Sequence, residues 1–353
     1  MFEIITEGYG SQAVSRVIED KNPATIAILT DANVEPIARQ KISGIPALQG
    51  APVCVIEPGE DNKSLASVER VVRMLCESGA TRRSLLVNIG GGMVTDLGGF
   101  AAAIFKRGID FINMPTSLLG AVDAAIGGKT AVNFMGLKNE LGAFRKPLCS
   151  IIRTADFATL PHQEMLSGYA EMVKTGYISS QALLDELMDA TRLLADTSLL
   201  ASPLRQCLEF KEDITRQDPE EHGIRAFLNF GHTAGHAFES LMLERHTPVA
   251  HGVAVAHGIL VALVLSHFRL GLPSFHASRY ASLLLKPLYP ALSISCRDYP
   301  RILELMGHDK KNATAGKATF VLLNDISKPE IVRDMAEDDI KSALDIYRDL
   351  TCQ

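Results

Sequence analysis

Two histidines, His232 and His236, lie four residues apart in the segment RAFLNFGHTAGHAFE. Residues at this spacing share one face of a helix, so both imidazoles could bind one metal ion or one anionic substrate. A third histidine, His251, follows in HGVAVAHG, and Glu171 lies upstream in the apolar segment GYAEMVKTG. Neutral imidazoles and a carboxylate are ligands that zinc accepts. The sequence therefore predicts a zinc site with one or two ligands to spare, and leaves open which residues bind the metal.

Several cations accompany these histidines. Lys174 lies three residues after Glu171, on the same helix face. An exposed ion pair would explain the two charges, but apolar neighbours such as Met172 indicate a buried helix, in which charges need partners. Lys211 and Arg225 add two more cations ahead of the histidines. Together these residues predict a pocket suited to an anionic ligand.

A glycine-rich stretch, GGGMVTD, directly follows the apolar run Ser84–Ile89. Glycines after a strand let the backbone approach a pyrophosphate, and the next helix begins with unpaired N–H groups and a partial positive charge. The stretch is not GxGxxG, so a tight strand-to-helix turn that needs positive φ is the alternative. Upstream, Glu60 and Lys63 in PGEDNKS could bind ribose hydroxyls and a dipolar ring, or simply form a solvated helix start.

A second unusual segment is PTSLLGAVDAAIGGKTAVNFMGLKNELGAF, which holds Asp123, Lys129, Lys138 and Asn139 among glycines and small residues. Lysines in such surroundings are good anion ligands, because the backbone can close around the bound group. A flexible loop with solvated lysines is the alternative. Just before it, Arg107 in FKRG could donate a planar pair of N–H groups to a phosphate or carboxylate.

These residues must be positioned by two regions with different patterns. In the first region, short apolar runs alternate with helical patterns such as Pro58–Gly79, which predicts a parallel sheet covered by helices on both faces. The predicted strands are Ala24–Thr30, Pro52–Glu57, Ser84–Ile89, Phe111–Met114 and Ser150–Arg153.

From about Pro161 onward the pattern becomes helical, and strand signals nearly vanish apart from Ala318–Leu323. The predicted helical segments are Gln163–Ile178, Gln181–Leu194, Pro203–Gln217, Arg225–Leu243, Gly252–Leu270, Arg279–Leu288 and Asp338–Leu350. We therefore expect two domains, an α/β domain over residues 1–158 and a mainly α-helical domain over residues 159–353.

Composition narrows the class of protein. The 353 residues are 47% hydrophobic and 22% charged, which is ordinary for a soluble globular protein. The net charge of −6, with no long basic run, argues against a nucleic-acid partner. The six cysteines form no CxxC pair, which favours reduced thiols in the cytoplasm.

Two further patterns bear on targeting. The start, MFEIITEGYG, lacks the basic-then-apolar pattern of a signal peptide. The longest apolar run, Gly252–Leu265, is short for a membrane span and is interrupted by His257, which we expect to be a core or metal-supporting histidine. The run predicts a buried core helix, and we expect no membrane partner.

The ordered motifs GGGMVTDLGGF, FKRG, PTSLLGAVDAAIGGKTAVN, KNELGAF, GYAEMVKTG, RAFLNFGHTAGHAFE, HG and HDKK resemble those of the 3-dehydroquinate synthase family, one of the sugar phosphate cyclases. The resemblance covers roughly residues 25–350. It implies a Rossmann-like NAD-binding domain followed by a mainly helical domain, the cofactor NAD+, and one divalent metal, usually zinc with cobalt as an alternative. It also implies a homodimer in which Arg107 reaches into the neighbouring subunit's site.

The resemblance also implies a role for each candidate residue. The metal ligands would be Glu171, His232 and His251, whereas His236 would face the substrate. The NAD contacts would be Asp31, Glu60, Lys63, Gly91, Gly92, Asp96, Thr116, Ser117, Lys138, Thr159 and Glu164. The catalytic and substrate contacts would be Arg107, Asp123, Lys129, Asn139, Lys174, Lys211, Arg225, Asn229, His236, Lys310 and Lys311.

The implied substrate is a small sugar phosphate, 3-deoxy-D-arabino-heptulosonate 7-phosphate. NAD+ would oxidise it, phosphate would leave by β-elimination, the hydride would return, and ring opening with an intramolecular aldol would give 3-dehydroquinate. Zinc would hold two adjacent hydroxyls and lower the pKa of the one being oxidised. The net reaction is that of a carbon–oxygen lyase of the shikimate pathway, which leads to aromatic amino acids.

The chain departs from the family pattern at Thr95, Leu137 and Val253. An acidic residue often occupies the last of these positions, where it could support a metal-binding histidine. Metal affinity is the property this change would affect.

Three other functions remain to be distinguished. Another sugar phosphate cyclase, such as a 2-deoxy-scyllo-inosose or 2-epi-5-epi-valiolone synthase, would act on a substrate without the same carboxylate. A metal-dependent polyol dehydrogenase of the glycerol type would release NADH in proportion to product. A binding module without catalysis would retain ligands and show no turnover.

Overall fold

The computed structural model describes residues 1–5, 10–307 and 318–351, and the chain forms two compact units. The first unit is Met1–Leu160 with Asp196–Glu212, and the second is Pro161–Ala195 with Asp213–Gln353. The sequence predicts a single division after residue 158, so the structure differs by placing Asp196–Glu212 with the first unit. Contacts explain this placement, because Lys211 donates to the backbone carbonyl of Asp123 and Glu212 pairs with the amine of Met1.

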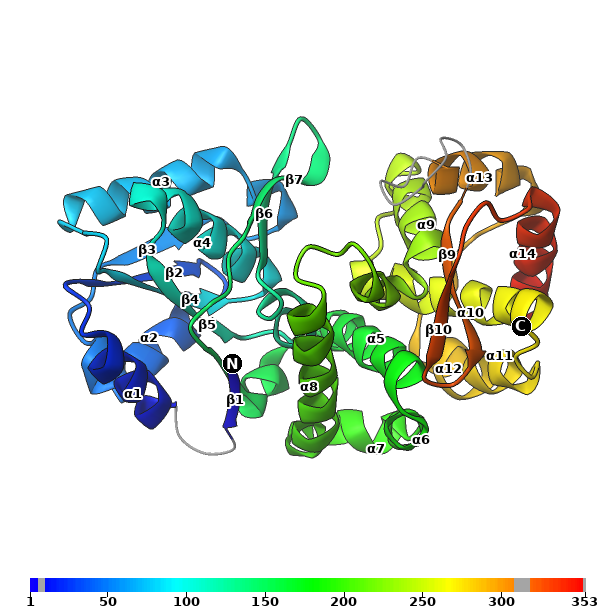
Figure 1. The fold of residues 1–353 in the computed structure, drawn as a ribbon, viewed down its shortest axis with the longest axis horizontal. Coiled ribbons are helices and arrows are strands. Elements are labelled where there is room, and N and C mark those ends of the chain that lie inside the picture. Colours follow the sequence, from blue (N-terminus) through cyan, green and yellow to red (C-terminus); the bar gives the residue numbers. More distant parts are fainter. Residues whose placement is uncertain (6–9, 308–317, 352–353) are drawn as a thin grey trace. The chain divides into compact units, whose positions relative to one another are not determined.

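A six-stranded parallel sheet forms the centre of the first unit (Figure 1). In spatial order its strands are β1 (Phe2–Ile5), β8 (Ser150–Arg153), β5 (Asp110–Pro115), β4 (Leu85–Gly90), β2 (Ile26–Asp31) and β3 (Val53–Ile56). All five predicted strands are present, and β1 is an addition that the sequence analysis missed. Every residue of β4 is buried, as expected of a strand whose two faces are both covered.

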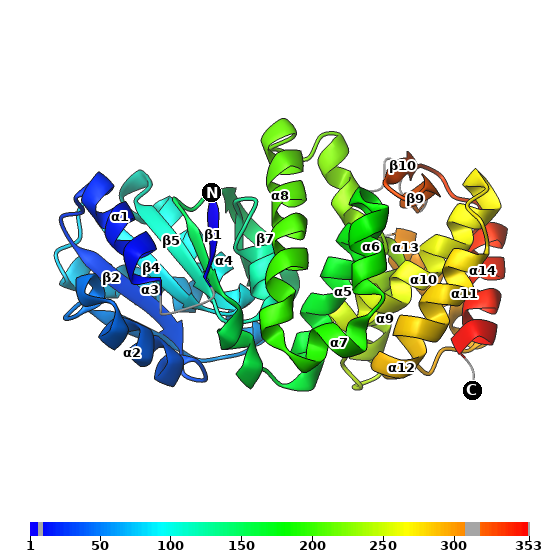
Figure 2. The same cartoon turned by 90° about the horizontal axis from the view of Figure 1, so that it is seen from below.

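Helices cover both faces of this sheet, as the sequence predicts. Successive side chains of a strand point to opposite faces, and in β2 the residues Ala27 and Leu29 join one buried cluster while Ile28 joins another. The first cluster includes residues of α3 (Leu65–Glu77) and α4 (Gly92–Ile104), and the second includes residues of α1 (Ser11–Lys21) and α2 (Glu35–Gly44). Figures 1 and 2 show the two helix pairs on opposite sides of the sheet.

The glycine-rich segment after β5 has more structure than the sequence suggests. It contains a π-helical turn, η4 (Gly120–Ala124), and an antiparallel hairpin of β6 (Lys129–Phe134) and β7 (Leu137–Phe144). Met135 (φ 52°) and Gly136 (φ 78°) occupy the tip, where two left-handed residues suit a tight hairpin turn. The short helices of this unit are η1 (Pro46–Leu48), η2 (Glu60–Asn62), η3 (Phe105–Arg107), η5 (Thr154–Thr159) and η6 (Thr197–Leu200).

The second unit is mainly helical, as predicted. Its helices are α5 (His162–Ser179), α6 (Gln181–Leu187), α7 (Ala190–Ala195), η7 (Ile224–Asn229), α9 (His232–Glu244), α10 (His251–Leu270), α11 (Phe275–Tyr280), η8 (Ala281–Leu285), α12 (Lys286–Leu288), η9 (Cys296–Asp298), α13 (Tyr299–Gly307) and α14 (Glu337–Thr351). A hairpin of β9 (Phe320–Asp325) and β10 (Lys328–Val332) accompanies them, and α8 (Ala201–Gln217) crosses the division between the units.

Two predicted helices are broken in the structure. The segment Gln181–Leu194 divides into α6 and α7, and Arg225–Leu243 divides into η7 and α9. The second break lies at Gly231, whose φ of 78° ends the 3-10 turn and lets α9 begin at His232. A left-handed residue is easily supplied by glycine, so the break follows from the sequence NFGHT.

The helix α10 lies at the centre of the second unit. Within the described part of the chain it is the one helix long and apolar enough to cross a membrane, yet 78% of its apolar window is buried inside the protein. Glycines bring its neighbours close: a Cβ at Gly252 would lie 2.0 Å from the Ser167 carbonyl of α5, and one at Gly258 would lie 2.0 Å from the Gly231 carbonyl before α9. These contacts set α5, α9 and α10 side by side, and those helices contain Glu171 and the three histidines of the predicted metal site.

Candidate metal centre and ligand-binding residues

The three histidines of the second unit form a cluster. The ring centroids of His232 and His236 are 5.3 Å apart, those of His232 and His251 are 5.4 Å apart, and those of His236 and His251 are 5.6 Å apart. One ring nitrogen from each residue lies within 4.8 Å of the others, a spacing that could hold a metal ion. The predicted meeting of α9 with the start of α10 is therefore present in the structure.

Glu171 lies against the same cluster. Its Oε1 atom is 3.5 Å from Nε2 of His232 and 3.7 Å from Nε2 of His251, and its side chain is only 1% exposed. Two ligand atoms that share one tetrahedral zinc ion are about 3.3 Å apart, because each lies about 2.0–2.1 Å from the metal. The carboxylate and the two imidazoles therefore fit a common ion. The cluster accommodates His236 as well, so geometry alone admits all four residues.

Hydrogen bonds orient two of the imidazoles. Nδ1 of His232 lies 3.2 Å from the Phe230 carbonyl, and Nδ1 of His251 lies 3.0 Å from Oε2 of Glu239. Since these oxygens accept, each neutral ring has its hydrogen on Nδ1 and its lone pair on Nε2, the atom nearer Glu171. A carboxylate behind a histidine is a usual support for a metal ligand.

Glu239 was missed by the sequence analysis, although it ends the quoted motif GHAFE. The family often has an acidic residue at the position of Val253, where it could support a metal-binding histidine. Val253 is buried and apolar, but Glu239 on α9 accepts the hydrogen bond from His251 instead. Only the close packing of α9 and α10 brings the two residues together.

Lys174 forms an ion pair with Oε2 of Glu171, and both side chains are at most 5% exposed. The exposed ion pair considered from the sequence is therefore excluded. One oxygen of the buried Glu171 carboxylate thus faces an ammonium, and the other faces two imidazoles. A cation or a polar substrate bound there would interact favourably with the carboxylate.

Arg225 and Asn229 are held by an ordered loop after α8. The carboxylate of Asp218 accepts hydrogen bonds from the backbone N–H groups of His222 (2.9 Å), Gly223 (2.8 Å) and Arg225 (3.0 Å). These bonds hold the pKa of Asp218 below its usual range, with that from Arg225 the largest cause. The Arg225 guanidinium donates to the Pro219 carbonyl at 2.6 Å.

Glu221, in the same loop, is a second residue that the sequence analysis missed. It has a φ of 62°, and its Oε1 accepts from Nδ2 of Asn229 at 3.0 Å. An acidic residue at a left-handed position, bonded to a predicted substrate residue, is a candidate site residue. The available signal was its place four residues before Arg225.

In the first unit, several predicted cofactor residues lie at the carboxyl ends of adjacent strands. Asp31 ends β2, Gly91 follows β4, and Thr116 follows β5, with its N–H bonded to the Gly90 carbonyl at 2.9 Å. Ligands of open parallel sheets bind at this edge. Burial raises the pKa of Asp31 above its usual value, against the lowering effect of the backbone bonds from Val34 and Asn33.

The glycines of GGGMVTD are explained by close packing. The alternative of a turn that needs positive φ is wrong, because Gly91 has a φ of −72° and the triplet has no left-handed residue. A Cβ at Gly90 would lie 2.6 Å from Val94, and one at Gly91 would lie 3.3 Å from Oγ of Ser117. The backbone at the start of α4, which includes Gly92, therefore remains unobstructed by side chains of its own.

Lys63 joins a cofactor residue to a substrate residue. Its ammonium donates to Oδ2 of Asp96 at 2.6 Å and to Oδ1 of Asn139 at 2.6 Å. Lys63 is 4% exposed, so the interpretation as a solvated helix start is wrong for Lys63, whereas Glu60 is exposed at the start of η2. Burial raises the pKa of Asp96 to about 6, although Lys63 acts to lower it.

The remaining predicted residues lie as follows. Lys211 on α8 donates to the backbone carbonyl of Asp123 at 2.6 Å and also pairs with its carboxylate. Lys129, Lys138, Thr159 and Glu164 are exposed, and so is Arg107, which has a left-handed φ of 68°. Lys310 and Lys311 lie outside the described residues.

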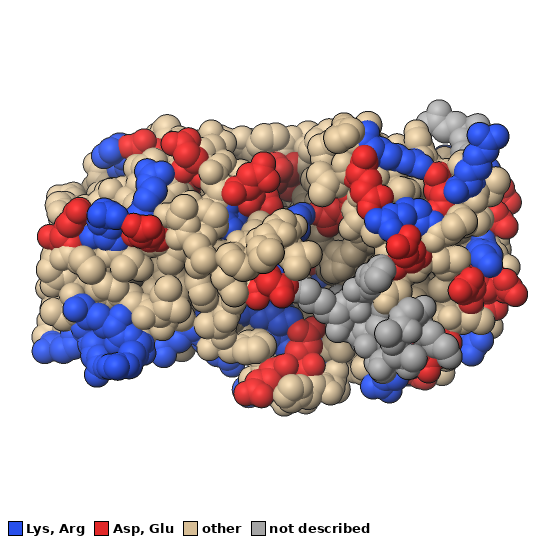
Figure 3. Space-filling view, turned by 90° about the horizontal axis from the view of Figure 1, so that it is seen from above, with Lys and Arg blue, Asp and Glu red and all other residues tan. Residues whose placement is uncertain are grey.

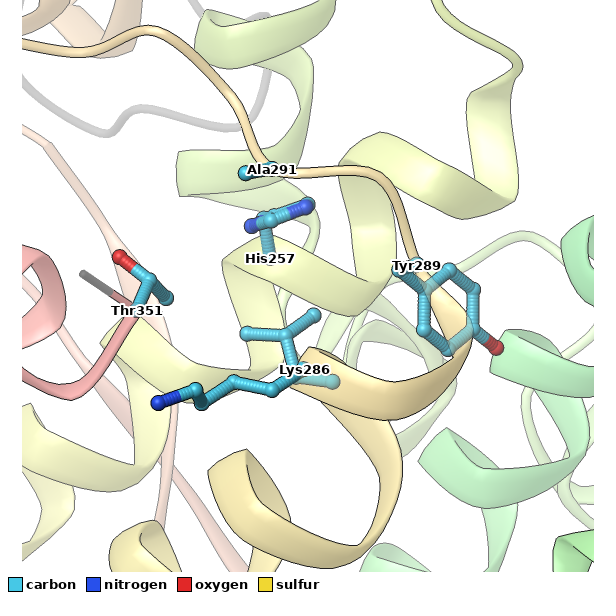
Figure 4. Close-up of a pocket in the computed structure, with 6 residues that line it drawn as sticks. His257, Lys286, Tyr289, Ala291 and Thr351 are labelled. Carbon is cyan, nitrogen blue, oxygen red and sulfur yellow. The ribbon is translucent and has the colours of Figure 1, made fainter. Parts of the chain in front are cut away.

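His257 is a core residue. Its Nε2 donates to the Pro290 carbonyl at 2.9 Å and its Nδ1 lies 2.7 Å from the Tyr347 hydroxyl. Burial lowers the pKa of His257 to about 4 and keeps the ring neutral. It lines a small pocket with Lys286, Tyr289 and Thr351 (Figure 4), and that pocket includes no predicted site residue.

The surface gives a broader view of charge. In Figure 3, acidic and basic side chains lie side by side among a larger area of uncharged ones.

This fold, a parallel sheet with a glycine-rich turn followed by a helical unit with a histidine cluster, is similar to that of a class of synthases solved with NAD+ and a divalent metal bound. The 2-epi-5-epi-valiolone synthase of Streptomyces hygroscopicus subsp. jinggangensis, solved with NAD+ and Zn2+ bound, aligns with a TM-score of 0.84 and 23% identity over 99% of this chain and 97% of its own. A 2-deoxy-scyllo-inosose synthase, complexed with carbaglucose-6-phosphate, NAD+ and Co2+, aligns with a TM-score of 0.82 and 24% identity over 97% and 95% of the two chains. At these identities the likeness establishes the fold.

Sequence similarity identifies the family within that class. The family models described as 3-dehydroquinate synthase N-terminal and 3-dehydroquinate synthase C-terminal match residues 53–167 and 168–312. The 3-dehydroquinate synthase of Parabacteroides distasonis is 46% identical over 322 residues, which span 91% of each chain. The chain belongs to the 3-dehydroquinate synthase family.

Proposed function

We propose that the residues described above perform the 3-dehydroquinate synthase reaction, in which 3-deoxy-D-arabino-heptulosonate 7-phosphate gives 3-dehydroquinate and phosphate. The chain is a phosphate-eliminating carbon–oxygen lyase of the shikimate pathway. The main structural support is the cluster of Glu171, His232 and His251 beside Lys174, since a buried carboxylate within 3.7 Å of two imidazoles suits a metal-dependent enzyme.

Glu171, His232 and His251 would hold the divalent metal, zinc or cobalt. When bound, such an ion polarises a substrate hydroxyl and lowers its pKa. His232 and His251 present their Nε2 atoms because Nδ1 of each ring is engaged by Phe230 or Glu239. His236, on the same helix face, would then turn to the substrate. Lys174 pairs with the second oxygen of Glu171 and would lie beside the substrate.

The cofactor would bind along the strand ends of the first unit, where NAD+ supplies a reversible hydride acceptor. Asp31, Gly91, Gly92 and Thr116 lie at that edge. Glu60 and Lys63 belong to the turn after β3, and Asp96 lies on α4, with its carboxylate held by Lys63. The strand ends supply backbone N–H groups and the Lys63 ammonium fixes the facing side chains.

Substrate anions require fixed cations. The phosphate would be bound by Lys129, Asn139, Arg107, His236 and one of Lys310 and Lys311. The carboxylate would be bound by Lys211 and Arg225. Arg225 is suited to this role because it is buried and both its backbone and its guanidinium are held by the Asp218–Pro219 loop. A preorganised donor of this kind stabilises charge without reorganisation during the reaction.

A homodimer and a cytoplasmic location complete the proposal. The exposed Arg107, in a left-handed turn at the end of η3, would bind the phosphate in the neighbouring subunit's site. The cysteines among the described residues form no disulfide, which suits a reducing compartment. Sedimentation of the purified protein tests the dimer directly.

A phosphate-release assay tests the function. The protein, with the heptulosonate phosphate, catalytic NAD+ and Zn2+, should release phosphate without accumulating NADH, and a chelator should stop the release. A hexose 6-phosphate without a carboxylate should be a poor substrate. Preferential turnover of that hexose phosphate would favour another cyclase, and NADH formed in proportion to product would favour a dehydrogenase.

A further inference from the structure

Asn133, which none of the predicted roles includes, lies at an irregular position of the β6–β7 hairpin. Val132 pairs with Leu141 and Phe134 with Leu137, so Asn133 alone lies opposite the three β7 residues 138–140, and the bulge is in β7. A bulge interrupts the regular ladder and changes the direction of the groups beside it. Asn133 therefore bonds both across the bulge to β7 and to residues outside the hairpin.

One end of the Asn133 amide binds the turn that contains two predicted cofactor residues. Its Nδ2 donates to the Glu60 carbonyl at 3.1 Å and to Oε1 of Glu60 at 3.0 Å. The backbone N–H of Asn133 donates to the Lys63 carbonyl at 2.8 Å. Three hydrogen bonds from one residue therefore fix both ends of η2, the turn between Glu60 and Lys63.

The other end of the same amide binds a predicted substrate residue. Oδ1 of Asn133 accepts from the backbone N–H of Asn139 at 2.9 Å. Asn139 has a φ of 53°, a left-handed conformation that is uncommon outside glycine and that asparagine adopts more readily than most residues. The hydrogen bond from its N–H to Asn133 holds the backbone in that conformation.

Lys63 links Asn139 to Asp96 and so completes this hydrogen-bond network. Its ammonium donates to Oδ1 of Asn139 at 2.6 Å and to Oδ2 of Asp96 at 2.6 Å. Because the amide oxygen of Asn139 is engaged by Lys63, the Nδ2 group of Asn139 is the end available to an anionic ligand. A donor is what a phosphate oxygen requires.

We propose that Asn133 is a positioning residue that couples the binding of NAD+ to the binding of the substrate phosphate. The inference rests on the proposed roles of Glu60 and Lys63 toward the cofactor and of Asn139 toward the phosphate. Asn133 holds all three in one hydrogen-bonded unit, so a ligand that orders one side lowers the cost of ordering the other. Such coupling is reciprocal.

The variant Asn133→Asp removes the hydrogen-bond donor of the side chain while keeping nearly the same size and shape. The carboxylate still accepts from the Asn139 N–H, but it cannot donate to Glu60 and it repels that side chain. A matched control is Asn324→Asp in the second unit, where the Asn324 amide donates to Oε1 of Glu330 at 3.2 Å. The two substitutions make the same charge change opposite a glutamate, and only the first touches the proposed unit.

Binding measurements on the full chain give the first readout. We expect Asn133→Asp to raise the Kd for NAD+ and the KM for the sugar phosphate by about tenfold each, because both hydrogen bonds to Glu60 are lost and the new carboxylate repels that of Glu60. Asn324→Asp should leave both constants within about twofold of wild type. The double variant Asn133→Asp/Asn139→Ala should have the same KM as Asn139→Ala alone, since Asn133 acts on the substrate through Asn139.

The second readout is the coupling between NAD+ binding and phosphate binding, which can be measured without turnover. With inorganic phosphate as the probe, the Kd for NAD+ of wild type should fall by about threefold or more, and this ratio should approach one in Asn133→Asp. Unchanged NAD+ affinity and an unchanged ratio in Asn133→Asp, with only a lower thermal stability, would overturn the proposal and leave Asn133 a structural residue. If wild type binds NAD+ with this coupling but releases no phosphate from the sugar phosphate, the proposed function alone fails.

Discussion

Removal of the carboxylate of Glu239 should weaken metal binding without altering any metal ligand. Oε2 of Glu239 lies 3.0 Å from Nδ1 of His251, and the Glu239 side chain is 16% exposed, so this is a partly buried, charge-assisted hydrogen bond. It fixes the tautomer that presents Nε2 and makes the imidazole a better donor to a metal. Loss of such support typically costs about 10–100-fold in metal affinity.

Two substitutions of Glu239 should weaken zinc binding to different extents. Glu239→Gln keeps an oxygen that can accept from Nδ1 but removes the charge, and we expect a loss of about tenfold in zinc affinity, equivalent to about 1.4 kcal/mol. Glu239→Ala removes the acceptor, and we expect a loss of about 100-fold, equivalent to about 2.8 kcal/mol. Glu244→Gln is the control, since Glu244 ends the same helix and pairs with Arg301 at the surface.

The assay is competition for zinc between the apoprotein and a chromogenic chelator, with circular dichroism to verify that each variant is folded. The order of zinc affinity should be wild type and Glu244→Gln, then Glu239→Gln, then Glu239→Ala. If folded Glu239→Ala binds zinc within about twofold of wild type, the hydrogen bond does not support the metal site and the reasoning is refuted.

Three further predictions concern the site. His232→Ala should lose zinc, whereas His236→Ala should retain zinc and lose turnover; metal analysis of both purified variants checks this, and equal loss of zinc would contradict the proposed division of roles. Arg225→Ala should lower kcat/KM by more than about 100-fold, about 3 kcal/mol of transition-state stabilisation, with an unchanged circular dichroism spectrum; near wild-type kcat/KM would contradict its role. Burial raises the pKa of Asp96 from 3.8 to about 6, so between these pH values the folded protein holds a proton that the unfolded chain has lost, and the contribution of Asp96 to stability falls as pH rises. The free energy of unfolding of wild type relative to Asp96→Asn should therefore fall by about 1–3 kcal/mol between about pH 4 and pH 6 in urea titrations, and a constant difference would contradict the raised pKa.

The sequence predicts the parallel sheet well because its strands are continuous apolar runs. β4, for example, is buried throughout and reads as SLLVNI between turn residues. The hairpin β6–β7 was hidden, because its two strands lie in a glycine-rich segment and several of their side chains are exposed. The break between η7 and α9 was also missed, since helical periodicity continues across Gly231 while the backbone there is left-handed.

In the candidate site, too, some residues could be predicted from the sequence and others could not. Glu171 and the three histidines could be chosen as candidates from the sequence, because metal-ligand types recur there at helical spacing, whereas the choice of Glu171, His232 and His251 as the ligands comes from the family resemblance. Glu239, Asp218 and Asn133 could not, since each acts by a hydrogen bond to one specific group in the fold. Such roles depend on the close packing of α9 with α10, on the path of a loop, or on a β-bulge, and periodicity does not reveal them.

The central claim is that the chain uses NAD+ catalytically to eliminate phosphate from a carboxylated sugar phosphate. The most direct measurement follows phosphate and NADH together, with zinc present and NAD+ equal to the enzyme. We expect many phosphates to be released per NAD+ with no net NADH, and none to be released by His232→Ala. One NADH formed for each product, or no phosphate release from zinc-loaded wild type, would contradict it.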